Sequence, residues 1–538
     1  MTALDRPARD EAAPGPVRIP FPVVDEVSRH CLQEAEPETV HIEVHLPGRL
    51  DPDRLRTAFL AALHRHPRIL MREAPGPWYR RRYEWELTEE PEVEVVTFLP
   101  AGPHALRDAR TRALMEAPPL TLSPPIRLEV VEGAGPAVGS EASDAVGLAT
   151  GSHAPTSPRP PGAASLAHSA AGNRAAGAMG VPPLERSREW GRAGAAAPRA
   201  AEQRTRPPAD TTPGHPENSG TDTAPTSTPS GTKDPGTVLF LTINHTALDG
   251  PACLRILATA AQLYGGQDNA PTAPPVRPTP AQDEPPQAET TPPSNWARPA
   301  RVAPGAPEPS PGNGLLVTEL PVPRRPKSAP YTVNDQLMVT TALMLAHWNR
   351  EHGAHPRPLR ITMPVDDRPR DTDMPIGNGT RLVEVTFSPD ELSRNHTPLA
   401  TLLRRTADRT RALKSLPCPQ LGHGASLLTA PVVPVSWRAA LTKGLRRAAA
   451  PWTSTTLLSN IGRVPYALDF GEEAGRAHAV WFSAPARMPR GLTVTTASTA
   501  GRLHLALRWS RSLLSHGDGA HLRDLFEHYL HATEEDIE

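Results

Sequence analysis

The residues of most chemical interest form the string NHTALDGP at 244–251. An imidazole, His245, follows an apolar run, and a carboxylate, Asp249, comes four residues later. Imidazole is the side chain best suited to accept a proton near neutral pH, so this string could carry a general base. The same spacing also describes a histidine and an aspartate beside an ordinary capped helix, so the string alone leaves both readings open.

The segments around the string predict how it is positioned. The run VLFLTI at 238–243 is continuous and apolar, which is typical of a strand buried on both faces. Pro251 suits the first turn of a helix, and apolar residues follow at helical spacing until Gly265. A strand-to-helix junction of this kind holds a side chain rigidly at the mouth of a cleft.

Composition narrows the class of protein. The chain has 538 residues, and its 67 prolines and 38 glycines indicate that much of it is not packed core. The net charge of −1 gives no field that would attract nucleic acid. Three cysteines without a CxxC pair argue against a disulfide framework and against a metal site. No apolar run reaches the ~18 residues of a membrane span, so we expect a cytoplasmic protein.

The composition changes along the chain and predicts its organisation. We expect a flexible N-terminus at 1–17 and a first globular half at 18–265, interrupted by a disordered insertion at 132–236. The strands at 126–131 and 238–243 flank this insertion and predict a hairpin that carries it at the tip. A segment at 184–190 is either a docking peptide or part of a solvated tract. A proline-rich linker at 266–311 leads to a second half at 312–538.

Alternating and helical patterns predict an α+β fold for both halves. Thr332 and Asp335 have the spacing of a capping box at the start of a helix that reaches residue 350. A closing amphipathic helix is expected at 520–532. Strands are expected at 40–46, 126–131, 238–243, 315–320, 359–363, 380–387, 455–458, 491–496 and 503–509.

Several strings resemble, in collinear order, the HxxxD-motif acyltransferase superfamily. This superfamily contains condensation domains of nonribosomal peptide synthetases, wax ester synthase/diacylglycerol acyltransferases and chloramphenicol acetyltransferase. The matching strings are HTALDG at 245–250, HRHP at 64–67, TVND at 332–335, PVDDRP at 364–369 with GN at 377–378, and SNIG at 459–462.

The resemblance implies two chloramphenicol-acetyltransferase-like α/β sandwich subdomains in a V with a central tunnel. His245 would be the catalytic general base for transfer of an acyl group from an acyl-CoA or acyl-phosphopantetheine co-substrate to a hydroxyl or amine. No cofactor or metal would be bound permanently. Asp249, Gly250 and Arg368 would be structural, with Asp249 paired to Arg368. Oxyanion or substrate contacts are expected from Asn244, Ser459, Asn460, Gly462 and Asn378.

Two alternatives stay open. Many relatives carry a second histidine where this chain has Asn244, which weakens an assignment to the peptide-bond-forming branch. One alternative is a free-standing condensation enzyme that forms an amide or ester with substrates bound to an acyl or peptidyl carrier protein. The other is a catalytically silent binding or scaffold protein with the same fold.

The remaining expectations concern partners. We expect a monomer that acts on small molecules in specialised metabolism, with no nucleic-acid partner. The segment at 437–452 combines tryptophan and leucine with basic residues. It predicts either a plain surface helix or one that touches a membrane, a lipid acceptor or an acidic carrier protein.

Overall fold

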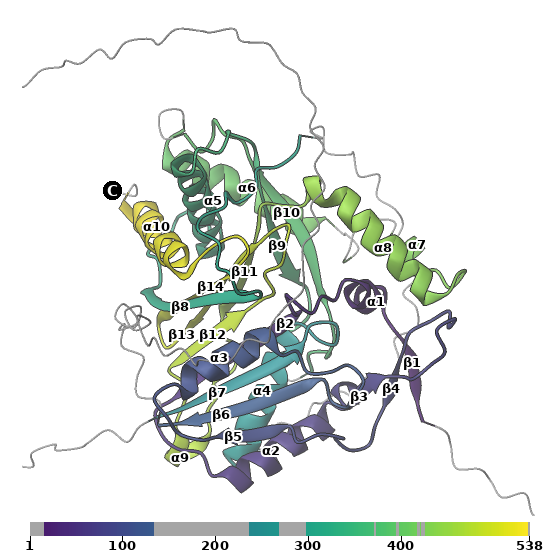
Figure 1. Ribbon diagram of the computed structural model, residues 1–538. Helices are drawn as coiled ribbons and strands as arrows, with labels where there is room; N and C mark the ends of the chain where they lie inside the picture. Colours follow the sequence, from purple (N-terminus) through teal and green to yellow (C-terminus); the bar gives the residue numbers. More distant parts are fainter. Residues whose placement is uncertain are drawn as a thin grey trace, which may run out of the picture. The chain divides into compact units, whose positions relative to one another are not determined.

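The computed structural model describes residues 16–133, 236–267, 297–370, 373–393, 397–416, 420 and 425–535 (Figure 1). Most of the expected insertion at 132–236 lies outside these ranges, and so do its 184–190 segment, most of the expected N-terminal tail and the first part of the linker. All described residues belong to one unit of the chain.

The first half of the chain contributes a mixed sheet and a small antiparallel sheet. The mixed sheet has the strand order β12-β2-β7-β6-β5, in which β12 (Ala479–Ser483) comes from the second half of the chain, and the antiparallel sheet has the order β1-β4-β3. The elements of this half are β1 (Arg18–Pro20), α1 (Val23–His30), β2 (Thr39–Leu46), α2 (Pro52–Arg65), β3 (Met71–Glu73), β4 (Glu84–Leu87), β5 (Val96–Leu99), α3 (Ala105–Met115), β6 (Ile126–Glu132), β7 (Thr237–Asn244) and α4 (Gly250–Tyr264).

The two strands that flank the expected insertion pair with each other. β6 and β7 run antiparallel, with Ile126 opposite Ile243 and Glu132 opposite Thr237. β7 is buried along its whole length, as its continuous apolar run predicts. The predicted hairpin is confirmed at both of its strands.

The second half builds a six-stranded sheet in the order β10-β9-β11-β13-β14-β8. The expected capping box is confirmed, because Asp335 Oδ2 accepts a hydrogen bond from Thr332 N at 2.8 Å. The elements are β8 (Asn313–Pro321), α5 (Val333–Glu351), β9 (Leu359–Asp366), β10 (Thr380–Phe387), α6 (Leu399–Ser415), α7 (Ala425–Thr429), α8 (Val435–Ala449), β11 (Thr456–Arg463), α9 (Gly471–Ala474), β12 (Ala479–Ser483), β13 (Leu492–Thr499), β14 (Arg502–Ser510) and α10 (His516–Glu535).

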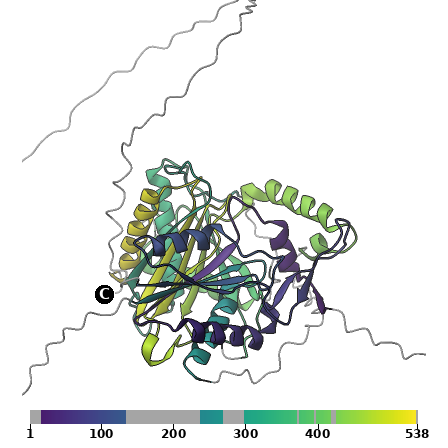
Figure 2. The same cartoon turned by 60° about the horizontal axis from the view of Figure 1, so that its bottom comes forward.

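Helices cover one face of the six-stranded sheet, and part of the other face lines a cavity. α5, α6 and α10 pack on the covered face, where Figure 2 shows α10 in yellow. Side chains of a strand alternate between the two faces, so Ile361 and Met363 of β9 enter the core beneath these helices. Pro364 and Asp366 alternate with them and point to the other face, where they line a cavity.

One strand crosses from the second half of the chain to the sheet of the first half. β12 pairs antiparallel with β2, with Val480 opposite Val44. Val480 and Phe482 accordingly belong to the first hydrophobic core, together with residues of β2 and α4. No strand was predicted here.

The end of the expected linker is packed against the second core. Ala300, Val302 and Ala303 are buried there, and Ala300 N donates to Pro358 O at 2.8 Å. The ordered second half therefore begins before residue 312. Among the helices of the described ranges, none combines the length and apolarity needed to cross a bilayer.

Candidate active site

The junction between β7 and α4 holds His245 and Asp249 rigidly. Asp249 is the N-cap of α4, and its Oδ1 accepts a hydrogen bond from Ala252 N at 3.1 Å. On the strand side, His245 N donates to Glu38 O at 2.8 Å. Gly250, the first residue of α4, lines the cavity beside them. Hydrogen bonds thus fix the backbone at both ends of the turn 245–249, and the imidazole of His245 has a defined position.

The His245 ring is oriented by a single backbone carbonyl. Nδ1 lies 3.0 Å from Leu248 O. A carbonyl oxygen only accepts, so Nδ1 carries the hydrogen and Nε2 of the neutral ring is left as a proton acceptor. His245 is half-buried and lines a cavity of about 330 Å³. This geometry is the one required of a general base that has access to a substrate.

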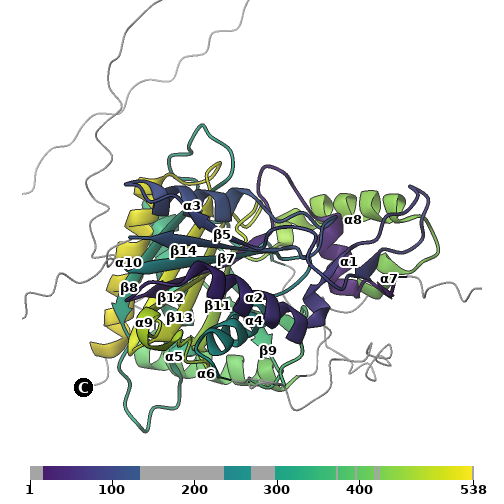
Figure 3. The same cartoon turned by 90° about the horizontal axis from the view of Figure 1, so that it is seen from below.

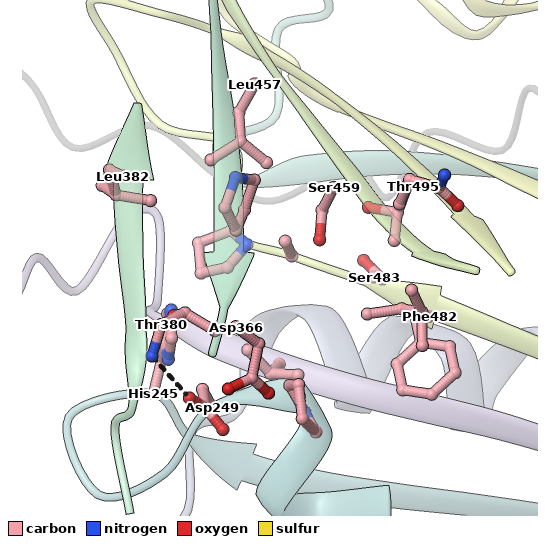
Figure 4. A pocket seen from close by; sticks show the side chains of 18 of the residues that line it. His245, Asp249, Asp366, Thr380, Leu382, Leu457, Ser459, Phe482, Ser483 and Thr495 are labelled. Atoms are coloured by element: carbon pink, nitrogen blue, oxygen red, sulfur yellow. Dashed lines mark hydrogen bonds between the residues drawn. The ribbon is translucent and has the colours of Figure 1, made fainter. Parts of the chain in front are cut away.

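Asp249 is not placed to act as a base, because both oxygens of its carboxylate already accept hydrogen bonds from the protein. Oδ2 accepts from Arg368 Nη2 at 2.7 Å, from Gly379 N at 2.8 Å and from Thr380 N at 3.2 Å. Figure 4 shows Asp249, Thr380 and Asp366 together with His245. Arg368 follows β9, so this carboxylate joins the start of α4 to the six-stranded sheet. The pairing of Asp249 with Arg368 is the one that the family resemblance implied.

Arg368 is held by two carboxylates. Its Nε also donates to Asp366 Oδ1 at 2.8 Å. Burial lowers the pKa of Arg368, but the hydrogen bonds and charges of Asp366 and Asp249 outweigh burial and leave the pKa above its ordinary value. The side chains of Asp249 and Arg368 are 3% and 11% exposed. The guanidinium is a fixed structural cation at this site.

A second buried carboxyl, Asp25 of α1, lies behind the histidine turn. Its Oδ1 accepts from Asn378 Nδ2 at 2.9 Å, and its Oδ2 accepts from Trp85 Nε1 at 2.9 Å. Asn378 Nδ2 also donates to Thr246 O at 3.0 Å, next to the catalytic candidate. Burial raises the pKa of Asp25 to about 6, against the opposing effect of Arg68. Sequence reasoning missed Asp25, because a single acid in a short helix has no distinguishing spacing.

Of the five residues expected to contact substrate, two line the cavity and three make contacts within the protein instead. Ser459 and Asn460 line the cavity with His245. Asn244 is buried instead, where its Nδ2 donates to Pro118 O at 3.2 Å. Asn378 holds Asp25, as described above. Gly462 follows a bulge in β11 at Ile461 and has φ +75°, and its N–H donates to Asn460 Oδ1 at 2.9 Å.

The side-chain amide of Asn460 forms hydrogen bonds with other residues of the protein. Its Nδ2 donates to Asn334 Oδ1 at 3.2 Å, and its Oδ1 also accepts from Thr496 Oγ1 at 3.1 Å. The TVND and SNIG strings therefore contact each other through Asn334 and Asn460. Ser459, whose hydroxyl faces the cavity, is better placed than Asn460 to donate to a substrate (Figure 4).

Further hydroxyls that were not predicted line the cavity, among them those of Thr495 and Ser483. Thr495 lies on β13, next to β11, and Ser483 ends β12. Ser483 Oγ is buried and has no hydrogen-bond partner among the described residues. A buried hydroxyl without a partner is costly, so Ser483 is suited to bind a substrate oxygen. Ser483 was not singled out from the sequence, because no strand was predicted at 479–483 that would place this side chain.

Four arginines line the cavity, namely Arg370, Arg446, Arg487 and Arg490. Arg490 Nη2 donates to Ser454 Oγ at 2.9 Å and to Thr362 Oγ1 at 3.4 Å. Thr362 precedes Asp366 by four residues of β9, which corresponds to ~13 Å of strand. Burial, with the nearby charge of Arg487, lowers the pKa of Arg490 to about 10. Arg490 thus contacts β9 at a point four residues before Asp366, the residue that binds Arg368 beside the histidine turn.

Only part of this positive charge is neutralised. Arg487 pairs with Glu38. Arg446 of α8 lines the cavity, and its Nη1 is buried without a hydrogen-bond partner among the described residues. The carboxylates that line the cavity are those of Glu38, Asp249 and Asp366, and all three already have arginine partners. Arg446 and Arg490 are consequently able to receive an anionic group.

Comparisons with known sequences give limited information. No family model matches the chain. Two uncharacterized proteins of Mycobacterium tuberculosis, from strains CDC 1551 / Oshkosh and H37Rv, are each 30% identical over 280 residues. Each match covers 47% of this chain and 62% of the relative. The alignment thus spans less than two thirds of the length of these relatives.

Solved structures give a clearer result. The condensation domain of the monacolin K polyketide synthase MokA matches 96% of this chain and 97% of its own, with 12% identity and a TM-score of 0.52. The trichothecene 15-O-acetyltransferase TRI3 of Fusarium sporotrichioides matches 96% and 95%, with 12% identity and a TM-score of 0.51. The starter condensation domain of rhizomide synthetase, in complex with C8-CoA and Leu-SNAC, matches 95% and 92%, with 12% identity and a TM-score of 0.51. The chain therefore has, over nearly its whole length, the α+β fold of condensation domains and of this acetyltransferase, as the resemblance of its motifs led us to expect.

Proposed function

We propose that this protein is an acyltransferase that moves an acyl group from a thioester donor to a hydroxyl or amine acceptor, with His245 as general base. The observation that carries the proposal is the Nδ1 contact with the Leu248 carbonyl. It leaves Nε2 as a proton acceptor on a side chain that lines the cavity.

The proton movements follow from this geometry. The acceptor hydroxyl or amine gives its proton to His245 Nε2 while its oxygen or nitrogen attacks the thioester carbonyl. The negative charge on the former carbonyl oxygen is stabilised by hydroxyl donors, for which Ser459 and Ser483 are the best-placed side chains. Collapse of the intermediate breaks the carbon–sulfur bond, and the leaving thiolate takes the proton back from Nε2.

The cations of the cavity support an anionic donor. Acyl-CoA and acyl-phosphopantetheine both carry phosphate at the end of a long arm that leads to the thioester. Among the described residues neither Arg446 nor Arg490 forms a salt bridge with a carboxylate; Glu384, whose charge acts on Arg490, is paired with Arg360. Arg490 contacts β9 at Thr362, four residues before Asp366. A donor arm that enters beside these arginines would place phosphate near them and the thioester near the imidazole, and the acceptor would then approach from the opposite side of a tunnel.

The experiment is turnover by the purified full chain with a panel of acyl thioesters and candidate alcohols or amines. Thiol release and product mass are the readouts, and they separate hydroxyl from amine acceptors and acyl-CoA from acyl carrier protein. A His245→Ala variant should lose about 10²- to 10⁴-fold in turnover with an unchanged melting temperature. The matched control is His64→Ala, because His64 is exposed. Equal turnover in wild type and His245→Ala would refute the role, and no turnover with any pair would favour a silent binding protein.

A further inference from the structure

Exposed apolar side chains are concentrated in two short segments of the molecule. Among the described residues, nine of the fourteen exposed large apolar side chains lie at 78–79 and 427–452. We call these nine the α8 face. They are Trp78, Tyr79, Leu427, Val432, Val433, Trp437, Leu441, Leu445 and Trp452. Scattered exposed apolar residues are ordinary, whereas a cluster of this size indicates an interaction surface.

The helix α8 presents one apolar stripe to solvent. Trp437, Leu441 and Leu445 are four residues apart and are 67%, 55% and 47% exposed. An adjacent face of the helix is anchored, because Val435, Arg438 and Thr442 are buried and Arg438 Nη2 lies 2.7 Å from Glu26 Oε1 of α1. This ion pair fixes the rotation of α8, so the exposure of the stripe is a feature of the packed fold.

The loop between β3 and β4 extends the same surface. Trp78 and Tyr79 are 74% and 60% exposed, and their rings pack edge to face at 5.7 Å. The loop is joined to the start of α8, because Val435 N donates to Arg80 O at 2.9 Å. Figures 1 and 3 both show α7 and α8 next to α1, against which both helices pack.

The charge of both segments has one sign. Residues 425–452 contain Arg438, Lys443, Arg446 and Arg447 and neither aspartate nor glutamate. The loop at 74–83 contains three consecutive arginines, 80–82, and likewise no acidic residue. Lys443 and Arg447 are exposed beside the apolar stripe, as Arg81 and Arg82 are beside the aromatic pair.

From these observations we propose that the α8 face docks the protein on the surface of an anionic lipid bilayer. Tryptophan, tyrosine and leucine on one side with lysine and arginine around them is the composition of interfacial membrane-binding segments. The cations complement anionic lipid headgroups, and the apolar stripe enters the acyl boundary. Arg446 extends from the same helix into the cavity, so docking would bring this part of the cavity close to the membrane.

The test is sedimentation of the purified full chain with vesicles, which needs no catalytic turnover. We expect the protein to sediment with vesicles of equal parts phosphatidylcholine and phosphatidylglycerol and to bind vesicles of phosphatidylcholine alone far more weakly. Trp437→Ser/Leu441→Ser and Trp78→Ser/Tyr79→Ser should each weaken binding by about 10-fold or more. Lys443→Gln/Arg447→Gln should weaken binding to the anionic vesicles and make it less sensitive to salt.

Two controls match these variants. Leu122→Ser removes an exposed apolar side chain outside the α8 face, and Arg404→Gln/Arg411→Gln removes two exposed charges from α6. Both should bind vesicles like wild type. The proposal is overturned if wild type stays in the supernatant, or if the α8 variants bind like wild type. It is also overturned if light scattering shows a dimer that Trp437→Ser/Leu441→Ser dissociates, or if a purified acidic carrier protein binds the face and vesicles do not.

Discussion

Arg368 Nη2 donates a hydrogen bond to Asp249 Oδ2 at 2.7 Å, although 119 residues separate the two side chains in sequence. Asp249 at the same time caps α4 and accepts from two backbone N–H groups at the start of β10. One carboxylate thus fixes the position of the histidine turn relative to the six-stranded sheet.

Replacement of Asp249 by alanine should reduce both stability and turnover. The change removes the N-cap and leaves a buried guanidinium with one carboxylate partner fewer. We expect the free energy of unfolding to fall by about 3–5 kcal/mol, as for other broken buried ion pairs. Urea denaturation measures this change. Asp53→Ala is the matched control, because Asp53 is 96% exposed in its pair with Arg56 and should change stability by less than about 1 kcal/mol.

Gly379 is the position where a single methyl group should break the same contact. A Cβ added there would lie 2.4 Å from Arg368 Nε, and the guanidinium cannot retreat without losing Asp249 or Asp366. Gly379→Ala should therefore lower turnover and melting temperature together. Gly444→Ala, in α8, has open space around the new Cβ. It should stabilise the protein by up to about 1 kcal/mol through helix propensity alone. Equal melting temperatures for the two variants would contradict this account.

Loss of a cavity arginine should weaken binding of the acyl donor more than it slows the chemical step. Arg490→Met removes a cavity cation that contacts Thr362 and Ser454 and not the histidine turn, so we expect KM for an acyl-CoA donor to rise about 10-fold or more with kcat nearly retained. With an N-acetylcysteamine thioester, which has no phosphate, the same variant should behave like wild type. Steady-state kinetics with both donors tests this, with Arg404→Met as the surface control. A rise in KM for both donors would argue against a phosphate contact.

A buried histidine outside the site should make stability depend on pH. Burial lowers the pKa of His504 to about 4, whereas an unfolded histidine has a pKa of about 6.5. Between these values the unfolded chain binds a proton that the folded chain does not, so the contribution of His504 to stability is lost as pH falls from 7 toward 4. His504→Leu should reduce the loss of stability between pH 7 and pH 5 by about 2 kcal/mol.

Urea denaturation at the two pH values measures that difference. His355 is exposed, so His355→Leu is the control and should leave the pH dependence of the wild type unchanged. If His504→Leu loses as much stability on acidification as wild type, His504 is not neutral in the folded protein.

Features that depend on neighbouring residues could be predicted from the sequence alone. The apolar run of β7, the histidine at its end and the cap and proline of α4 all lie within 28 residues of one another. The hairpin of β6 and β7 was also predictable, because two strands of matching length flank a stretch whose composition predicts no packed core.

Tertiary structure decided what distant segments do at the site. Ser483 reaches the cavity only because the five residues of β12 pair with β2, and Asp25 lies behind the histidine turn only because α1 packs there. Asn244 looked like a substrate contact in the string, yet the fold buries its amide against Pro118. Hydrophobic periodicity records which side of an element is buried, but it does not record which element covers that side. For this reason His245 and its neighbouring Asp249–Arg368 pair could be expected from the sequence motifs, whereas the positions of Ser483 and Asp25 could not.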